Sequence, residues 1–144
     1  YYVSVVTNAY RHAIDEFLGN KSISEWVLDE VRKVRHRDYS TGFYFGDGKS
    51  NQYYKDSGYI RNYDIVAVVD KCENGFMYLT QRNKFSVGEV IEIMKPDGRN
   101  IETVVEGIWD LEGNEQESAP HARQALKVKL RDIPDEMDLL RRSE

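Results

Sequence analysis

The sequence has few of the residues that cross-link small proteins or bind metals in them. Among its 144 residues there are one cysteine, three histidines and three prolines. A single cysteine, Cys72, cannot close an intrachain disulfide, and no Cys-x-x-Cys or Cys/His spacing of a zinc or iron–sulfur site is present. We therefore expect a chain that folds on its own hydrophobic core, with no cofactor and no metal, in the reducing cytoplasm.

Long apolar runs and targeting signals are also missing. No apolar stretch approaches the roughly 20 residues that span a bilayer, so no membrane association is expected. The start, Tyr1 to Ser4, has neither a charged leader region nor a cleavage site, and it lacks an initiator methionine. Because the helical pattern begins at once, we expect the chain to have been cut from a longer protein.

Positive charge is scarce in the second part of the chain. Residues 1–58 carry eight Lys/Arg and eight Asp/Glu, whereas residues 59–144 carry twelve against seventeen, which accounts for the whole net charge of -5. Nucleic-acid binding depends largely on Lys and Arg that displace counterions from phosphates. The net charge thus does not support general RNA binding, and any RNA contact has to be local.

The first third of the chain predicts two helices. Gly19-Asn20 is expected to end the first, and Ser22 with Glu25 has the spacing of a capping box for a second helix over about residues 23–36. The first helix has one apolar stripe, formed by Val3, Val6, Tyr10, Ala13, Ile14, Phe17 and Leu18.

Alternation with period two predicts five or six short strands beyond Tyr59. Asn74-Gly75 between two such runs is a strong hairpin signal, and Gly98 and Gly113 fall where tight turns require a positive φ. Residues 38–57 before them, rich in glycine, serine and aromatics, predict a long loop. The runs with one polar and one apolar face are 64–69, 76–80, 90–94, 101–106 and 126–131.

The predicted fold class is mainly β with flanking helices (α+β), built on a small closed β-barrel. Closure is favoured because it leaves no unpaired sheet edge. Two helices precede the barrel, and Asp132 as N-cap with Pro134 in the first turn predicts a short C-terminal helix. We divide the chain into a helical lead-in, 1–37, which is the end of an upstream catalytic domain plus a linker helix, and a barrel domain, 38–144.

Four segments carry a resemblance to a known family. They are Arg35 to Tyr44 (RHRDYSTGFY), Gln81 to Glu89 (QRNKFSVGE), Val90 to Met94, and Met137 to Arg142 (MDLLRR). The first resembles the segment that precedes the C-terminal domain of the peptidase U32 family, the collagenase-like proteases, and the other three resemble that family's tail. The resemblance covers roughly residues 1 to 142 and identifies the chain with the family's C-terminal domain. The pattern Asn83-x-Phe85-x-Val87-Gly88-Glu89 also resembles domain 2 of translation elongation factors, which implies a barrel of that type.

The resemblance implies that the family's chemistry lies outside this chain. In the family the catalytic or cofactor-bearing part is an upstream barrel of alternating strands and helices with clustered cysteines, and none of this is present in the sequence. Similar proteins are linked to hydroxylation of RNA bases as well as to peptidase activity. Both interpretations stay open for the parent protein.

No set of residues in the sequence has the signature of a complete active site. The acidic pairs Asp110 with Glu112 and Glu115 with Glu117 are more typical of a solvated loop than of an acid–base pair. Cys72 is more typical of a packing thiol than of a nucleophile. A protease would have to combine Ser40, Ser86 or Cys72 with His12, His36 or His121, and no family signature surrounds any of them.

A basic cluster directly followed by aromatic residues is the candidate binding site. Such an arrangement can pair phosphate contacts with base stacking. Alternatively, the cations complement the end of the second helix and pair with Asp29, Glu30 and Asp38, while the aromatics cover the barrel. The candidate residues are Arg32, Lys33, Arg35, His36, Arg37, Tyr39, Phe43 and Tyr44, with Phe45 next to them.

The tyrosines offer a further hypothesis, because tyrosine is enriched at protein interfaces. Tyr53, Tyr54, Tyr59 and Tyr63 would then contact the upstream catalytic domain of the same polypeptide. The sequence as a whole predicts a non-catalytic accessory domain of a U32 peptidase, acting in binding of a protein or peptide substrate or in docking on the catalytic domain. The alternative is an RNA-positioning module of an RNA base-hydroxylating enzyme.

Overall fold

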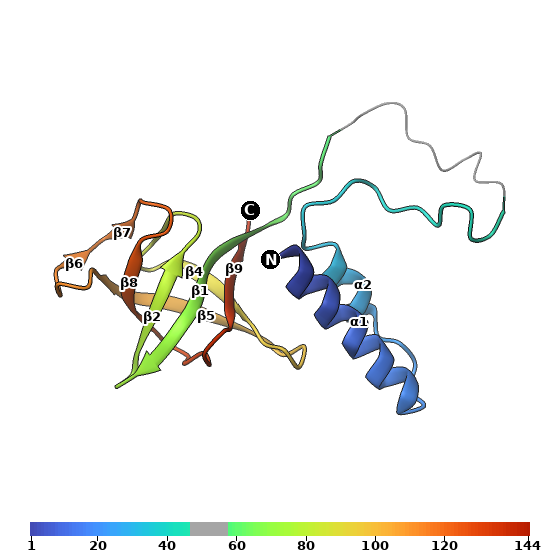
Figure 1. Ribbon diagram of the computed structural model, residues 1–144, viewed down its shortest axis with the longest axis horizontal. Helices are drawn as coiled ribbons and strands as arrows, with labels where there is room; N and C mark the ends of the chain where they lie inside the picture. Colours follow the sequence, from blue (N-terminus) through green and yellow to red (C-terminus); the bar gives the residue numbers. More distant parts are fainter. Residues whose placement is uncertain (47–57) are drawn as a thin grey trace.

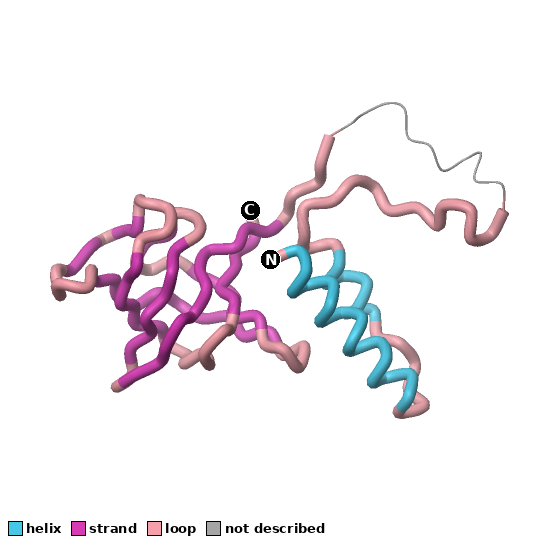
Figure 2. The backbone as a smooth tube through the Cα atoms, viewed as in Figure 1, coloured by secondary structure: helices cyan, strands magenta, loops and turns pink. Residues whose placement is uncertain are grey.

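Two helices stand against one side of a β-barrel. The structure is a computed structural model that describes residues 1–46 and 58–144. Helices α1 (Tyr2–Leu18) and α2 (Glu25–Val31) lie side by side (Figure 1), and Figure 2 shows the strands gathered in a separate body next to them. The strands are β1 (Tyr63–Glu73), β2 (Phe76–Gln81), β3 (Phe85–Ser86), β4 (Val90–Met94), β5 (Asn100–Trp109), β6 (Glu115–Gln116), β7 (Ser118–Ala119), β8 (Ala125–Leu130) and β9 (Leu139–Ser143).

Six of the described strands close into the barrel. The hydrogen-bonded order is β4-β9-β1-β2-β8-β5, and β4 also pairs with β5, which joins the two ends of the sheet. All of these pairings are antiparallel. The expectation of a mainly β fold with a closed barrel behind two helices is confirmed.

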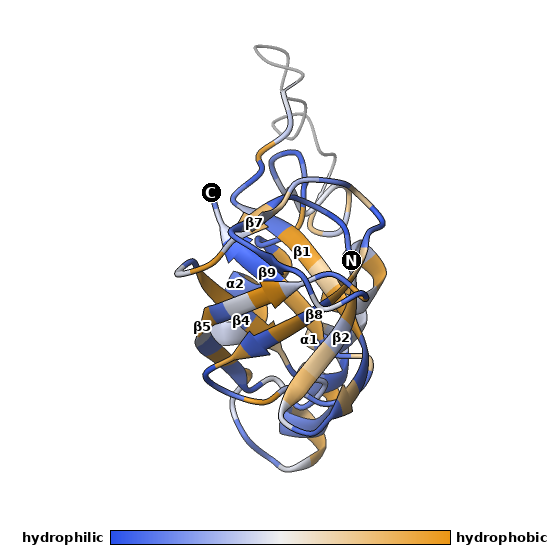
Figure 3. Ribbon diagram, turned by 90° about the vertical axis from the view of Figure 1, so that its left-hand side faces the viewer, coloured by the Kyte–Doolittle hydropathy of each residue, from blue (hydrophilic) through white to orange (hydrophobic). Residues whose placement is uncertain are grey.

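Local sequence signals determine the strand ends and the inward faces. Asn74 and Gly75 both have positive φ (53° and 79°) in the two-residue turn between β1 and β2, as the Asn-Gly signal predicts. Along each strand, alternate residues face the barrel interior, and Figure 3 shows apolar and polar stretches side by side on the strands. The buried core includes Val66, Val69, Met77, Leu79, Phe85, Ile91, Ile93, Val105, Ile108, Leu126, Val128 and Leu140.

The prediction of a short C-terminal helix is wrong. Residues 132–138 form a turn, and the chain then ends in β9, which fills the gap between β1 and β4. The Asp132 N–H donates to Thr103 Oγ1 (3.0 Å), and Met137 takes a left-handed φ of 71° with its N–H on the Val69 carbonyl (2.8 Å). Barrel closure therefore outweighs the local helix signal of Asp132 and Pro134.

The second helix is shorter than predicted, and its predicted capping box does not form. Helix α2 begins after Ser24, not Ser22, and the Ser24 N–H is satisfied by the Glu16 carboxylate of α1 (2.8 Å). The helix ends at Val31, so that Val34 can pack against the barrel.

Part of the predicted loop falls outside the described residues. This applies to residues 47–57, with Tyr53 and Tyr54 among them. Within residues 1–46 and 58–144, no helix is both long enough and apolar enough to cross a membrane.

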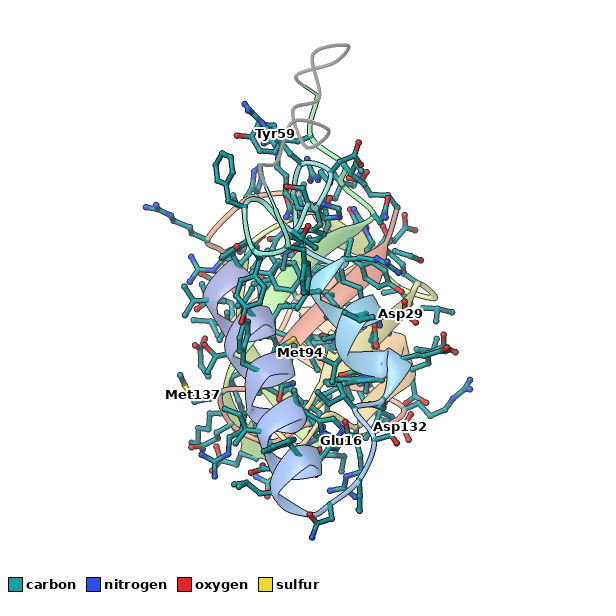
Figure 4. The ribbon with its side chains drawn as sticks, turned by 90° about the vertical axis from the view of Figure 1, so that its right-hand side faces the viewer. Glu16, Asp29, Tyr59, Met94, Asp132 and Met137 are labelled. Carbon is teal, nitrogen blue, oxygen red and sulfur yellow. The ribbon has the colours of Figure 1, made fainter. Side chains whose placement is uncertain are left out.

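A buried ion pair joins the helices to the barrel. Leu140 points into the barrel, so the next residue, Arg141, points outward, yet it is 0% exposed because the helices cover it. Its guanidinium donates two hydrogen bonds to Glu30 of α2 (2.5 and 2.9 Å) and two to Glu92 of β4 (3.0 and 3.2 Å). A small apolar cluster of Val5, Val34 and Met94 lies in the same layer, and Figure 4 labels Met94 behind the two helices.

The charges in this junction hold one another ionised. Burial alone would raise the pKa of Glu30, but hydrogen bonds and charge from Arg141, with Lys33 at 3.4 Å, lower it instead. Burial raises the pKa of Tyr1 to about 12, and its hydroxyl donates to the Lys33 carbonyl (3.0 Å). A third donor, the Asn100 amide, reaches Glu30 at 3.2 Å. The junction is therefore a network of several donors around two carboxylates and not a single ion pair.

Glu30→Gln should destabilise the chain strongly, because it leaves the buried Arg141 charge short of a partner. We expect a loss of about 3 kcal/mol in the free energy of unfolding, measured in urea. Asp29→Asn is the matched control on the same helix, since the Asp29–Arg32 pair is exposed (65% and 61%) and worth less than about 1 kcal/mol. Equal effects of the two substitutions would contradict this role for the junction.

The contribution of Glu30 to the free energy of unfolding should decrease as the pH falls. Its pKa is lowered in the folded state from the ordinary 4.5, so the unfolded chain takes up the proton first as the pH falls. The stabilisation is then complete well above pH 4.5 and is lost as the pH falls through the folded pKa. We expect the stability difference between wild type and Glu30→Gln to be constant between about pH 6 and 8 and to shrink at lower pH. A difference that grows on acidification would contradict the sign.

Candidate functional site

The structure divides the predicted basic cluster between two places. Lys33 turns toward the junction, where its Nζ lies 3.4 Å from Glu30 and 3.5 Å from Glu92. Arg32 stays on the surface and pairs with Asp29 (3.4 Å). Two of the pairings expected under the alternative interpretation, with Asp29 and Glu30, are thus present. Lys33 is only 20% exposed, so it is poorly placed to reach a ligand.

The other two arginines meet on one tyrosine. The guanidinium carbons of Arg35 and Arg37 lie 4.6 Å and 5.1 Å from the centre of the Tyr59 ring. Both arginines are exposed, and Tyr59 is 52% exposed at the upper end of the molecule in Figure 4. Among the described residues, neither arginine forms an ion pair with a carboxylate. One ring therefore positions two cations, and no carboxylate of the described residues neutralises them in an ion pair.

The residue between the two arginines anchors this part of the chain. His36 and Ile60 exchange two backbone hydrogen bonds (3.1 and 2.8 Å). The His36 ring stacks on Tyr39 at 4.4 Å, with 16° between the ring planes, and the Tyr39 hydroxyl donates to the Val31 carbonyl (2.8 Å). We call Arg35, His36, Arg37, Tyr39 and Tyr59 together the basic edge.

The remaining predicted aromatics do not cover the barrel. Phe43, Tyr44 and Phe45 are 78%, 86% and 83% exposed, and Tyr44 contacts Phe45 edge to face at 5.2 Å. The interpretation in which these rings pack on the barrel is wrong for all three. Exposed rings of this kind have free faces, which is what a stacking partner requires.

The side chains considered for catalysis make local structural contacts. The Cys72 thiol donates to the Pro134 carbonyl (3.1 Å), and burial, with nearby acids, raises its pKa, which disfavours the reactive thiolate. His12 Nε2 lies 3.3 Å from Glu16, and its ring packs on Trp26. Asp110 accepts two hydrogen bonds from Asn114, which lower its pKa, the opposite of what a general acid needs.

A metal site also finds no support in the part of the chain that the structure describes. There, no three His, Cys, Asp or Glu side chains come together as ligands would have to. The arrangement that the described residues do offer is a binding surface, with two positioned cations and exposed rings beside them. Its chemistry suits an anionic partner with planar groups.

Sequence reasoning missed the partner that arranges this surface. Tyr59 was assigned to a protein interface, yet its ring carries both arginines. The contact joins residues more than 20 positions apart across the predicted loop, where no periodic signal exists. The next residue, Ile60, forms an isolated antiparallel β-bridge with His36, and no local sequence pattern predicts it.

Comparison with protein families divides the chain in two. Residues 61–141 match the model of the peptidase family U32 C-terminal domain, and residues 1–53 match that of peptidase family U32. The boundary between the two matches falls between the helices and the barrel.

The curated relatives are much longer than this chain. The tRNA hydroxylation protein P1 of Bacillus subtilis is 33% identical over 136 residues, which cover 90% of this chain and 32% of the relative. The tRNA hydroxylation protein P of Escherichia coli is 28% identical over 83% of this chain and 27% of its own length. The chain thus spans about a third or less of the relatives that it matches.

A solved structure has the same barrel. The C-terminal domain of a Geobacillus thermoleovorans protein classed as a U32 peptidase is 30% identical, with a TM-score of 0.51, over 56% of this chain and 92% of that domain. The agreement of fold, sequence and family match over the barrel leads to one assignment. This chain belongs to the peptidase U32 family and carries its C-terminal domain at residues 61–141.

Proposed function

We propose that this chain is the accessory C-terminal region of an RNA-modifying U32 protein and that its basic edge holds tRNA for a catalytic part elsewhere in the polypeptide. The observation that carries the proposal is the pair of exposed guanidiniums on the Tyr59 ring. The names of the relatives, which are tRNA hydroxylation proteins, support a nucleic-acid partner over a peptide. With a role on tRNA, we expect the protein in the cytoplasm.

The charge distribution is consistent with contact at one place. The barrel part is acidic, with twelve Lys/Arg against seventeen Asp/Glu in residues 59–144. Phosphates are repelled by such a surface and attracted where cations gather without carboxylate partners. The basic edge meets this condition, since Arg35 and Arg37 form no ion pair with the described carboxylates. The basic edge is therefore the place where we expect RNA to bind.

A second candidate function keeps the peptidase name of the family. In it, the chain presents a protein or peptide substrate to the catalytic part. The observation in its favour is an apolar groove of about 420 Å³ between the helices, lined by Val6, Tyr10, Leu28, Val31 and Tyr39 among others. An extended peptide could place apolar side chains there. The groove lacks exposed backbone strands that would pair with such a peptide, which makes it the weaker candidate.

Replacing both arginines should weaken RNA binding and its salt dependence together. In a salt series with labelled tRNA, Arg35→Ala/Arg37→Ala should bind less tightly, and the slope of log affinity against log salt should fall by about 2, one for each lost phosphate contact. Arg11→Ala/Arg99→Ala removes the same charge from exposed positions elsewhere, so it should leave the slope nearly unchanged. No binding of the wild type at low salt, or equal loss in both variants, would refute the proposal.

Tyr59→Ala tests the same edge without changing its charge. Because the ring positions both guanidiniums, its loss should lower tRNA affinity about 3- to 10-fold, comparable to a cation–π contact. The salt slope should stay as in wild type, since both arginines remain. Tyr78→Ala is the control, since Tyr78 also lies under a cation, Lys71, but on the barrel. An affinity unaffected by Tyr59→Ala would show that the ring has no part in binding.

A further inference from the structure

Helix α1 has one buried face, of mixed polarity, and a second, apolar face that the structure leaves largely exposed. The inner face, with Val5, Asn8 and Ala9, is buried against the rest of the molecule. The second face is the apolar stripe that the sequence predicts, and we define the α1 stripe as Val3, Val6, Tyr10, Ile14 and Phe17. Four of its five residues are at least half exposed: Val3 73%, Tyr10 66%, Ile14 50% and Phe17 70%.

The polar part of α1 is too narrow for a surface helix. The side chains that separate the inner face from the α1 stripe on the solvent side are Ser4, Thr7, Arg11 and Asp15, one row at helical spacing. A helix at the surface of a finished domain carries a broad polar face opposite a single apolar one. A buried face, an exposed apolar face and only one exposed polar row between them are typical of a helix that is buried on both sides.

The surface around the α1 stripe is hollowed in a way that suits protruding side chains. A shallow depression of about 350 Å³ lies on it, lined by Val6, Tyr10 and Ile14 among others. The groove of about 420 Å³ between α1 and α2 continues from it, since Val6 and Tyr10 line both. Figure 4 looks onto this side of the molecule, where both helices face the viewer. Contiguous apolar surface of this extent marks an interaction site.

We infer that the α1 stripe and the adjoining groove are the docking surface for the rest of the U32 domain, the part of the relatives that this chain does not span. Two observations identify this occupant. Residues 1–53 match the model of family U32 itself and not that of its C-terminal domain, and the relatives are about three times longer than the matched region. The helices thus join the barrel on one face and the catalytic part on the other.

The inference deepens the proposed function, because it sets the distance between the bound RNA and the catalytic part. Tyr39 lines the groove and also stacks on His36 within the basic edge. The basic edge therefore lies at the rim of the docking surface. An RNA held by Arg35 and Arg37 would reach the docked domain without crossing the acidic barrel.

Cysteine labelling tests the docking surface directly. This chain is joined to the rest of the Bacillus subtilis relative in place of the region that matches it, and Phe17→Cys (70% exposed) is compared with Leu111→Cys, a similarly exposed barrel position (66%). Labelling is read position by position by peptide mass spectrometry, because Cys72 is also a free thiol. In the chain alone both cysteines should react with a maleimide at similar rates. In the fusion the cysteine at 17 should react at least about tenfold more slowly, because burial protects it, while that at 111 keeps its rate.

The other outcomes are equally informative. Reaction at position 17 as fast in the fusion as in the chain alone overturns the inference. So does a dimer of the isolated chain in sedimentation that Ile14→Lys/Phe17→Lys abolishes while Leu111→Lys/Ile133→Lys does not, since a second copy would then be the occupant. The RNA proposal is judged separately, because tRNA binding by the isolated chain needs the basic edge and not the α1 stripe.

Discussion

The buried contact of Arg141 with Glu30 and Glu92 determines how the whole molecule is arranged. A guanidinium is costly to remove from water, and the cost is offset only when its donors are matched by well-placed acceptors. Here two carboxylates, from α2 and from β4, accept four hydrogen bonds from a fully buried side chain on β9. Because each partner comes from a different element, the network can form only when helices and barrel meet in one orientation.

The position of the basic edge follows from this orientation. Lys33, which belongs to the same network, is only two residues from Arg35, and its ammonium also lies 5.0 Å from the ring of Tyr63 at the start of β1. The chain leaves the junction there, and the bridge between His36 and Ile60 aligns it with the segment that enters β1. Tyr59 is thereby brought under the two arginines. The position of the exposed Arg35 and Arg37 thus depends on the network around the buried Arg141.

The sequence predicts the features that depend on local interactions, and it does not predict those that depend on contacts between distant residues. The Asn74-Gly75 turn and the alternation of Ile91 and Ile93 depend on neighbours in sequence, so both were predictable. The burial of Arg141 depends on a helix 111 positions away, and the strand that replaces the predicted C-terminal helix depends on a gap between β1 and β4. For the candidate site, the residue types were predictable, but which of them face the buried junction and which face solvent was not. Lys33 and Arg35 look alike in sequence and face opposite environments.

The two sides of the helical pair differ in the kind of contact that they can make. On the barrel side, the helices combine the apolar contact of Val5 with Met94 and the ion pair of Glu30 with Arg141, and such buried charges favour one orientation. The α1 stripe on the other side is apolar apart from the Tyr10 hydroxyl, and the burial of apolar surface is favourable but non-directional. In the docking that we propose, the module takes its orientation from the buried charges and its attachment from the apolar face. Because the basic edge takes Arg35 and Arg37 from the segment after α2 and Tyr59 from the segment before β1, a shift of the helices on the barrel would separate the two arginines from the ring.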